Sequence, residues 1–242
     1  MYFSSYPLVE AFGITLAFGL TAYFLGTVSK SGLWGGVVIG ALIYYCGGWP
    51  SFAVLGTFFI LASLVTRAGY RRKQALGAAQ ESGGKRGARH AAANCAVGLA
   101  LALIYKLSGA NPLAGAAFVA SFATAAADTA GSEAGPLVGR ITVLPTSFKR
   151  VSPGTPGAVS LEGTLVSLAA AGFIALTGWL VGLAGSAGMA VAAALSGFAA
   201  AFAESVLGSF PRIERTLGNE GMNLLNTALG AVFCLIALIL AR

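Results

Sequence analysis

SAGMAVAAALSGFAAAFAESVL, residues 186–207, is a 22-residue stretch in which Glu204 is the only charged side chain. A helix needs about 20 predominantly apolar residues to cross the hydrocarbon core of a bilayer, so this stretch alone predicts a transmembrane helix. Further apolar runs occupy residues 7–28, 33–46, 51–66, 88–107, 112–127, 159–181 and 221–240. The sequence therefore predicts an all-α fold, a polytopic transmembrane helix bundle of about seven or eight spans with no β-sheet.

The run at residues 33–46 is short for a span and is closed by Gly47-Gly48-Trp49-Pro50. It forms either a tight pair of spans with residues 51–66, or a tilted or re-entrant segment. A re-entrant segment would move the N-terminus to the other side of the membrane and leave the rest of the topology unchanged.

Composition agrees with lipid as the main solvent. The 242 residues are 57% hydrophobic and 10% charged, with a mean hydropathy of +0.81, whereas soluble domains carry about 25% charged residues. Cys46, Cys95 and Cys234 have no paired spacing, so we expect neither a disulfide framework nor a cysteine metal site. The lone His90 and the lack of a Walker A motif or zinc-ligand spacing disfavour serine hydrolases and zinc enzymes. We expect no cleaved signal peptide, because no basic segment precedes the first apolar run.

The basic residues predict one integral membrane domain over residues 1–242. It comprises N-terminal spans at 1–66, a basic cytoplasmic loop at 67–88 and motif-bearing spans at 89–242. With eight spans, 13 of the 15 basic residues fall on one side, and only Lys106 and Arg242 fall on the other. Basic loops mark the cytoplasmic face, so we expect a protein of the cell (inner) membrane whose site faces the cytoplasm.

Acidic residues gather on that same side, although they do not set orientation. Five of the eight lie at the cytoplasmic ends of spans: Asp128, Glu133, Glu162, Glu204 and Glu220. Carboxylates near hydrocarbon are costly and usually functional. One such residue is more simply explained as a helix cap or a snorkelling side chain. Five with polar partners favour a functional site.

Those partners lie on two of the predicted helices. Arg86, His90 and Asn94 share a helix face at i, i+4, i+8 spacing, and Arg89 lies beside them. A polar stripe runs along the last span, formed by Asn219, Glu220, Asn223, Asn226 and Thr227. The stripe predicts either a cavity wall or hydrogen bonds that hold the helices together.

The loop SPGTPGAVS, residues 152–160, follows Lys149 and Arg150 and leads into a span. Glycines allow a ligand to approach closely, and backbone N–H groups near a helix N-terminus attract anions. An ordinary turn with prolines at the helix entry is the simpler explanation of the loop by itself. Carboxylates beside a basic, glycine-rich loop are the components of a metal–nucleotide site, because carboxylates hold Mg²⁺ and the metal bridges phosphate oxygens.

Several motifs together resemble one known family. ADTAGSE at residues 127–133 is similar to its Ala-Asp-Thr-Trp-(Ala/Ser)-Ser-Glu motif, with Ala130 in place of the tryptophan. Residues 151–160 resemble its glycine loop, with departures at Pro156 and Ala158. Residues 204–208 and 219–230 resemble its two later motifs, and residues 89–94 its Arg…Ala-Asn segment, which Cys95 follows in place of the usual glycine. The family is that of transmembrane protein 19 and the phytyl-phosphate kinase of vitamin E biosynthesis.

The resemblance implies a kinase that transfers a phosphoryl group from CTP, or another nucleoside triphosphate, to an isoprenyl monophosphate in the membrane, with Mg²⁺ as cofactor. We expect the prenyl tail to lie between small-residue helices. Expected catalytic residues are Asp128, Glu133, Glu204, Lys149 and Arg150. Expected metal ligands are Asp128, Glu133, Glu204 and Glu220. Expected phosphate- or nucleotide-binding residues are Arg86, Arg89, Asn94, Arg140, Ser152, Gly154, Thr155, Gly157, Ser160, Asn219, Asn223 and Asn226.

Two alternatives belong to other functional classes. A CTP-dependent lipid cytidylyltransferase would release pyrophosphate and leave CMP on the lipid. A transporter without enzymatic activity should carry polar residues at the membrane midplane and inverted repeats, whereas the polar residues here lie at one end. Nucleic acid is not an expected partner, because basic loops of a membrane protein set topology.

Overall fold

The computed structural model describes residues 7–80 and 82–241. Its helices, in chain order, are α1 (Pro7–Phe24), α2 (Lys30–Arg67), α3 (Tyr70–Ala75), the short 3₁₀ helix η1 (Ser82–Gly84), α4 (Ala88–Leu107), α5 (Pro112–Val138), α6 (Leu161–Leu180), α7 (Ala187–Gly208) and α8 (Pro211–Leu240). The strands are β1 (Thr142–Val143) and β2 (Val159–Ser160), which pair antiparallel, Thr142 opposite Ser160. The helical membrane-protein fold is confirmed, and this two-residue ladder is the one addition to the expected all-α architecture.

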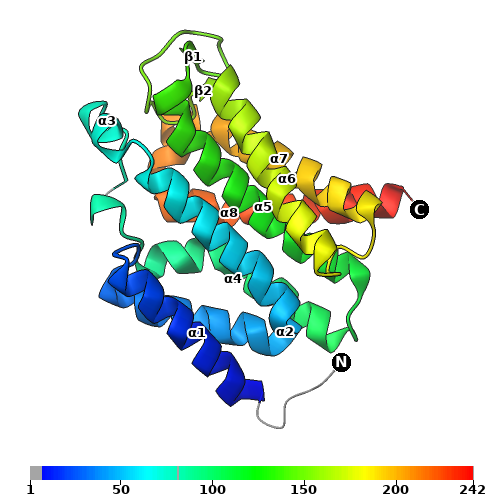
Figure 1. Ribbon diagram of the computed structural model, residues 1–242. Coiled ribbons are helices and arrows are strands. Elements are labelled where there is room, and N and C mark those ends of the chain that lie inside the picture. The colour runs from blue at the N-terminus through cyan, green and yellow to red at the C-terminus, as the bar shows by residue number, and fades with distance from the viewer. Residues whose placement is uncertain (1–6, 81, 242) are drawn as a thin grey trace.

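Helix α2 contains two of the expected spans, because it bends sharply at Gly48. Gly48 has φ 66° and ψ −162°, values outside the helical region, and Pro50 follows it. Near the bend, the Tyr45 carbonyl accepts a 3.1 Å hydrogen bond from Lys106 at the far end of α4. Arg67, the last residue of α2, donates to the Leu25 carbonyl just before α2 begins. The second half therefore returns to the end where the first half starts, as the tight-pair alternative predicts (Figure 1).

The number of apolar segments agrees with the division of α2 into two spans. Six helices, α2 and α4 to α8, are long and apolar enough to cross a membrane, and Leu8–Phe24 of α1 is a shorter apolar helix. With α2 divided at Gly48, the described residues contain eight apolar helical segments. Lys106 lies at the end away from the basic loops, as expected, and Arg242 falls outside the described residues.

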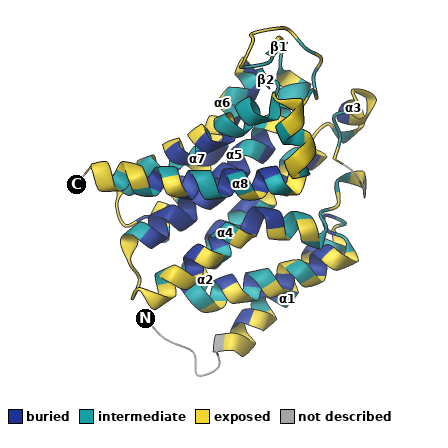
Figure 2. Cartoon of the chain, turned by 180° about the vertical axis from the view of Figure 1, so that it is seen from behind, coloured by how far each residue is buried: buried dark blue, intermediate teal, exposed yellow. Residues whose placement is uncertain are grey.

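Helix α5 forms the centre of the bundle and packs against α2, α4, α6, α7 and α8. Its side chains from Ala114 to Ala127 are all buried (Figure 2). Most of them are alanine, which allows close helix packing in lipid. A Cβ on Gly197 of α7 would lie 2.8 Å from the Cβ of Ala123, so α5 and α7 approach closely at this glycine. The outward faces of the surrounding helices carry the exposed apolar residues, which suit a lipid environment.

The connections that carry most basic residues lie together at one end of the bundle. Figure 1 shows α3, β1 and β2 at that end, and the start of α1 and the end of α8 away from it. Helix α8 also changes direction there, because Gly218 has φ 60° and ψ −179°. A short segment rich in polar residues, Pro211–Leu217, therefore precedes the apolar part of α8. We call this end of the molecule the loop end.

Candidate functional site

A cavity of ≈ 360 Å³ opens at the loop end. Its walls come from the last turns of α5, the first turns of α6, the end of α7 and the region of α8 around Gly218. The segment 153–160 covers it, and Ala78, Gln80 and His90 complete the lining. The cavity thus lies where five separately predicted motifs converge.

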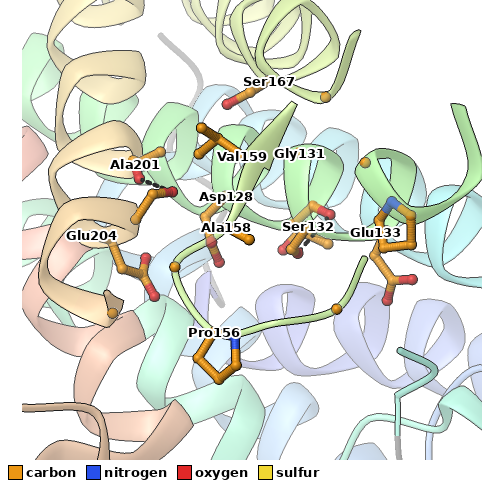
Figure 3. Close-up of a pocket in the computed structure, with 18 of the residues that line it drawn as sticks. Asp128, Gly131, Ser132, Glu133, Pro156, Ala158, Val159, Ser167, Ala201 and Glu204 are labelled. Atoms are coloured by element: carbon orange, nitrogen blue, oxygen red, sulfur yellow. Dashed lines mark hydrogen bonds between the residues drawn. The ribbon is translucent and has the colours of Figure 1, made fainter. Parts of the chain in front are cut away.

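Two carboxyl groups, from Asp128 of α5 and Glu204 of α7, line this cavity near each other. Figure 3 shows both side chains directed toward the segment that carries Pro156 and Ala158. Asn226 of α8 donates through Nδ2 to the Oε2 atom of Glu204. The Oδ1 atom of Asn226 is buried and has no hydrogen-bond partner. Three helices therefore bring together a carboxylate pair and an amide oxygen with unused acceptor capacity.

Glu133 has a different environment, although it also lines the cavity. It lies five residues after Asp128, which places the two side chains roughly 140° apart around α5. Its Oε2 atom forms an ion pair with Lys73, whose side chain is 0% exposed. Lys73 also donates to the carbonyls of Val65 (2.9 Å) and Thr66 (2.7 Å), at the C-terminal end of α2. A cation there satisfies free carbonyls and the negative end of the helix dipole.

Lys73 was not among the expected site residues. It belongs to the run Arg71-Arg72-Lys73, which has the composition of a solvated cytoplasmic loop. No local pattern distinguishes the third basic residue from its two neighbours. Its burial depends on α3 folding back over the end of α5, which is a tertiary contact.

The covering segment consists of two consecutive tight turns. Thr155 N–H donates to the Ser152 carbonyl at 3.2 Å, and Ala158 N–H donates to the Thr155 carbonyl at 3.0 Å. Each turn has proline followed by glycine at its centre, with φ +86° at Gly154 and +73° at Gly157. Proline then positive-φ glycine is the pattern of a type II turn. Pro156, a departure from the family pattern, therefore forms part of the second turn.

Gly157 fixes the position of this segment against α7. A Cβ at residue 157 would overlap the Ser209 backbone nitrogen and lie 2.6 Å from the Gly208 carbonyl carbon. Ser160, the last residue of the segment, caps α6 by accepting a 3.1 Å hydrogen bond from Gly163 N–H. The close backbone approach at Gly157 and the side-chain cap at Ser160 therefore hold the segment over the carboxylates.

The expected site residues divide into two groups. Those that line the cavity are Asp128, Glu133, Gly154, Thr155, Gly157, Ser160, Glu204, Asn219 and Asn223. Those outside its lining are Arg86, Arg89, Asn94, Arg140, Lys149, Arg150, Ser152, Glu220 and Asn226. Residues 89, 140, 149, 150 and 220 are exposed. Arg140 forms a 3.8 Å ion pair with Glu162.

The four carboxylates expected to bind a metal are not brought together. Among residues 7–80 and 82–241, no group of three or more His, Cys, Asp or Glu side chains is arranged to hold a metal ion. Glu220 is exposed and Glu133 is paired with Lys73. The pair Asp128 and Glu204 is the part of that set that the fold assembles.

His90 and Asn94 share a face of α4, as expected, but Arg86 precedes that helix and instead forms a β-bridge with Val28. The Asn94 Nδ2 atom donates to the His90 carbonyl at 3.0 Å, and the Arg86 Nη2 atom donates to Thr66 Oγ1 at 3.2 Å. Burial lowers the pKa of the Arg86 guanidinium from its ordinary value, and the nearby carboxylates of Glu133 and Asp128 oppose that shift. Arg86 is therefore, with Lys73, one of two cations outside the lining that interact electrostatically with the cavity acids.

The charge of the cavity wall follows from these positions. Its described lining contains the carboxylates of Asp128, Glu133, Glu204 and Glu214 and no lysine or arginine. Lys73, which lies outside the lining, neutralises the charge of Glu133 through an ion pair. The Asp128–Glu204 pair has no ion-pair partner in the described part of the chain. Adjacent buried carboxylates repel each other unless a cation or a proton is shared between them. This pair of carboxyl groups can therefore accept either a cation or a shared proton.

Comparison with known proteins places the chain among membrane proteins. The model of a family described as integral membrane protein DUF92 matches residues 13–231. Protein VTE6, chloroplastic, of Arabidopsis thaliana is 34% identical over 216 residues, which are 86% of this chain and 65% of the plant protein. An uncharacterized membrane protein of Synechocystis sp. is 38% identical over 135 residues, 55% of this chain and 52% of that protein.

An uncharacterized membrane protein of Methanocaldococcus jannaschii is 30% identical over 205 residues, which cover 85% of this chain and 83% of the archaeal protein. The chain thus spans just under two thirds of the plant relative and about half of the cyanobacterial one. No solved structure matches the chain.

Proposed function

The chain belongs to the DUF92 family of integral membrane proteins, and from that premise we propose that it is a nucleoside-triphosphate-dependent kinase of isoprenyl monophosphates. A phosphate oxygen of the lipid attacks the γ-phosphorus of CTP or another nucleoside triphosphate. The new O–P bond forms as the bond between the γ-phosphorus and the β–γ bridging oxygen breaks. The nucleoside diphosphate leaves, and the lipid becomes a diphosphate.

One observation carries the proposal: the half-buried carboxylates of Asp128 and Glu204 lie together beneath the double-turn segment at the loop end. This is where a helix bundle in a membrane meets water. A nucleotide can arrive there from the aqueous phase, while an isoprenyl chain stays in hydrocarbon. The basic loops support a cytoplasmic location for this end, in the cell membrane.

The donor set fits Mg²⁺. That ion is usually held by one or two carboxylates together with substrate phosphates, and the cavity wall offers Asp128 and Glu204. Asn226, outside the lining, donates to Glu204 and keeps an unpartnered Oδ1 atom. In phosphoryl transfer, bound Mg²⁺ neutralises charge on the triphosphate. Glu133, held by Lys73, keeps one buried oxygen without a partner and faces the same cavity as a second acceptor.

The other residues bind and orient the phosphates. Asn223, buried in the wall, donates its amide to a phosphate oxygen, and Asn219 does the same at the rim. Gly154 and Gly157 let the triphosphate approach the backbone of the covering segment. Lys149, Arg150 and Arg140 are exposed around the entrance, where clustered positive charge raises the local concentration of an anionic nucleotide.

No side chain needs to act as a strong base. A phosphate monoester has a second pKa of about 6, so the attacking oxygen is already ionised near neutral pH. Positioning and charge neutralisation then account for most of the catalysis, as in other phosphoryl transfers. This agrees with a cavity that has carboxylates and amides but only one histidine in its lining.

The test uses the full chain in lipid nanodiscs with a C15 or C20 isoprenyl monophosphate, Mg²⁺ and, in separate reactions, CTP, ATP, GTP or UTP. Mass spectrometry should find the isoprenyl diphosphate and the nucleoside diphosphate with at least one donor. A chelator should stop the reaction, and Mg²⁺ in excess should restore it. Release of pyrophosphate with a CMP-linked lipid would instead identify a cytidylyltransferase. Absence of any nucleotide-dependent product with all four donors would contradict the proposal.

A further inference from the structure

A second cavity, of ≈ 90 Å³, lies between α1, both halves of α2 and the first turns of α4. We call it the α1–α2–α4 slot. Its wall is almost entirely apolar, with Phe18, Leu33, Ile39, Leu55 and Phe58 among its lining residues. Its polar residues cluster at the loop end, where Arg86, His90 and Asn94 line it. The slot therefore has a cationic mouth at the membrane surface and an apolar interior that extends into the bundle.

His90 lines both the slot and the cavity of ≈ 360 Å³ at the loop end, which we call the phosphate cavity. It therefore lies at the junction of the two. A molecule whose phosphate lies at His90 can extend a chain into the slot while its oxygen faces the cavity that contains Asp128 and Glu204. Arg86 stands on the slot side of this junction. Within the described residues, the Arg86 side chain donates only through its Nη2 atom, to Thr66 Oγ1 and the Ala62 carbonyl. A guanidinium has five N–H donors, so Arg86 retains donors for a phosphate.

The slot also reaches the surface that faces lipid. Gly36 lines it and is exposed, and a Cβ added at Gly36 would meet no atom within 4 Å. From Gly32 beside the mouth to Gly40 in the interior, α2 rises by about 12 Å. Gly36 lies halfway along that wall. A chain that enters at Arg86 can therefore pass Gly36 and leave sideways into the bilayer.

We propose that the α1–α2–α4 slot binds the isoprenyl chain of the lipid substrate, with Arg86 and His90 holding its phosphate at the junction of the two cavities. This assignment rests on the proposed kinase function. The slot is narrow, so it accepts the proximal part of a single isoprenyl chain and not the two acyl chains of a diacyl lipid. Its polar mouth lies beside the phosphate cavity, which orients the chain with its phosphate toward the nucleotide.

The test combines a blocking variant with photolabelling. Gly36→Leu places a large side chain at a position that lines the slot and has room for a Cβ, and Gly36→Ala adds the Cβ alone. Gly13→Leu is the matched control, because Gly13 is also an exposed helical glycine with no atom within 4 Å of an added Cβ, and it does not line the slot. Leucine and alanine favour helix over glycine, so unfolding temperatures should not fall in any of the three.

The probe is a C15 isoprenyl monophosphate with a diazirine on its second isoprene unit. In the parent protein we expect it to label residues 15–22, 32–40 and 52–59. Gly36→Leu should reduce labelling and raise the KM for a C15 monophosphate roughly tenfold, the loss expected when about two CH₂ groups lose their burial. The KM for the nucleotide should stay unchanged, Gly36→Ala should be intermediate, and Gly13→Leu should behave like the parent.

The possible outcomes distinguish the proposed binding of the isoprenyl chain in the slot from the proposed kinase reaction. Slot labelling without nucleotide-dependent turnover would support chain binding and contradict the kinase function. Turnover with labelling confined to α6 or α7, or a Gly36→Leu variant indistinguishable from Gly13→Leu, would overturn the slot. Equal competition by diacyl phosphatidic acid would also overturn it, because it would identify a general lipid groove.

Discussion

The polar side chains at the two ends of the helix bundle differ in their burial and in their hydrogen-bond partners. Away from the loop end, Glu10 is exposed and accepts a 2.6 Å hydrogen bond from the Tyr44 hydroxyl. Lys106 lies 3.2 Å above the Tyr45 ring and donates to the Tyr45 carbonyl. At the loop end, Glu133 and Asn226 are buried, and each keeps one side-chain oxygen without a hydrogen-bond partner. Asp128 and Glu204 face each other there without a cation in the cavity lining.

Unpartnered acceptors are expensive to bury, because each loses its hydration without a compensating hydrogen bond. A fold that satisfies the polar groups at one end could satisfy them at the other. At the loop end the buried acceptors of Glu133 and Asn226 can still accept hydrogen bonds, whereas Glu10 and Lys106 at the other end are exposed and have the partners named above. The following variants test this contrast between the two ends.

The largest expected effect is on stability, at the Lys73–Glu133 pair. Lys73→Met should lower the free energy of unfolding by about 3–5 kcal/mol, because it leaves a buried carboxylate uncompensated. Lys106→Met, at the other end, should cost only about 0.5–1 kcal/mol, the range for an exposed cation–π contact. Denaturant titration in detergent micelles measures both. Equal losses would remove the contrast, and adding Glu133→Gln to Lys73→Met should recover part of the stability.

The next effect is on turnover, at Asp128. Asp128→Asn keeps the size of the side chain and removes its charge, so kcat/KM should fall by roughly 10²–10³-fold, as when other preorganised electrostatic groups are removed. Glu10→Gln makes the same chemical change at the other end and should leave the rate unchanged. Steady-state assays at saturating Mg²⁺ compare the two. Full activity in Asp128→Asn would rule out a role for this carboxylate in binding the metal.

Two glycines with similar backbone conformations allow a finer comparison. Gly157 at the loop end has φ +73°, and Gly182 between α6 and α7 has φ +82°. An alanine costs about 1–3 kcal/mol of backbone strain at either position, but only at Gly157 would its Cβ overlap neighbouring atoms. Gly157→Ala should therefore displace the covering segment and raise the KM for the nucleotide, whereas Gly182→Ala should change stability alone. Similar nucleotide KM values in the two variants would show that the segment does not contact the nucleotide.

The smallest effect is expected at Tyr44. Tyr44→Phe removes one hydrogen bond to Glu10 and should cost about 0.6 kcal/mol, the average for polar side-chain hydrogen bonds in membrane helices. The same denaturant titration measures it, with no change expected in turnover. A loss of unfolding free energy as large as that of Lys73→Met would mean that the polar groups at this end also contribute strongly to stability.

Much of the fold could be predicted from the sequence because lipid imposes simple rules. The eight apolar runs correspond to helical segments, and the glycine–proline group at residues 47–50 coincides with the bend in α2. Asp128 and Glu204 were expected at a site because five carboxylates with polar partners at the ends of spans are not simply explained as helix caps, and the fold places both in the wall of one cavity. Their mutual approach was not predictable, since it depends on how closely α5 and α7 pack at Gly197.

Charge was the least reliable guide to position within the loops. Lys73 and Lys149 both belong to basic loops, yet one is fully buried and the other exposed. The difference arises from α3, which carries Lys73 against the ends of α2 and α5, whereas the loop with Lys149 extends outward. Short-range sequence patterns contain no information about such folding back. The positive-inside rule assigns both residues to the same side and says nothing about depth.

The central position of α5 has a consequence for biogenesis. During synthesis this helix enters the membrane after α1, α2 and α4 but before α6, α7 and α8 exist. Its small residues offer lipid little to pack against, and its apolar window is the least hydropathic of the six long helices. Until α7 and α8 follow, Asp128 lacks Glu204 and Asn226 as neighbours. We therefore expect retention of α5 at that stage to depend on its contacts with α2 and α4, so that the N-terminal half assists the insertion of the half that carries the cavity.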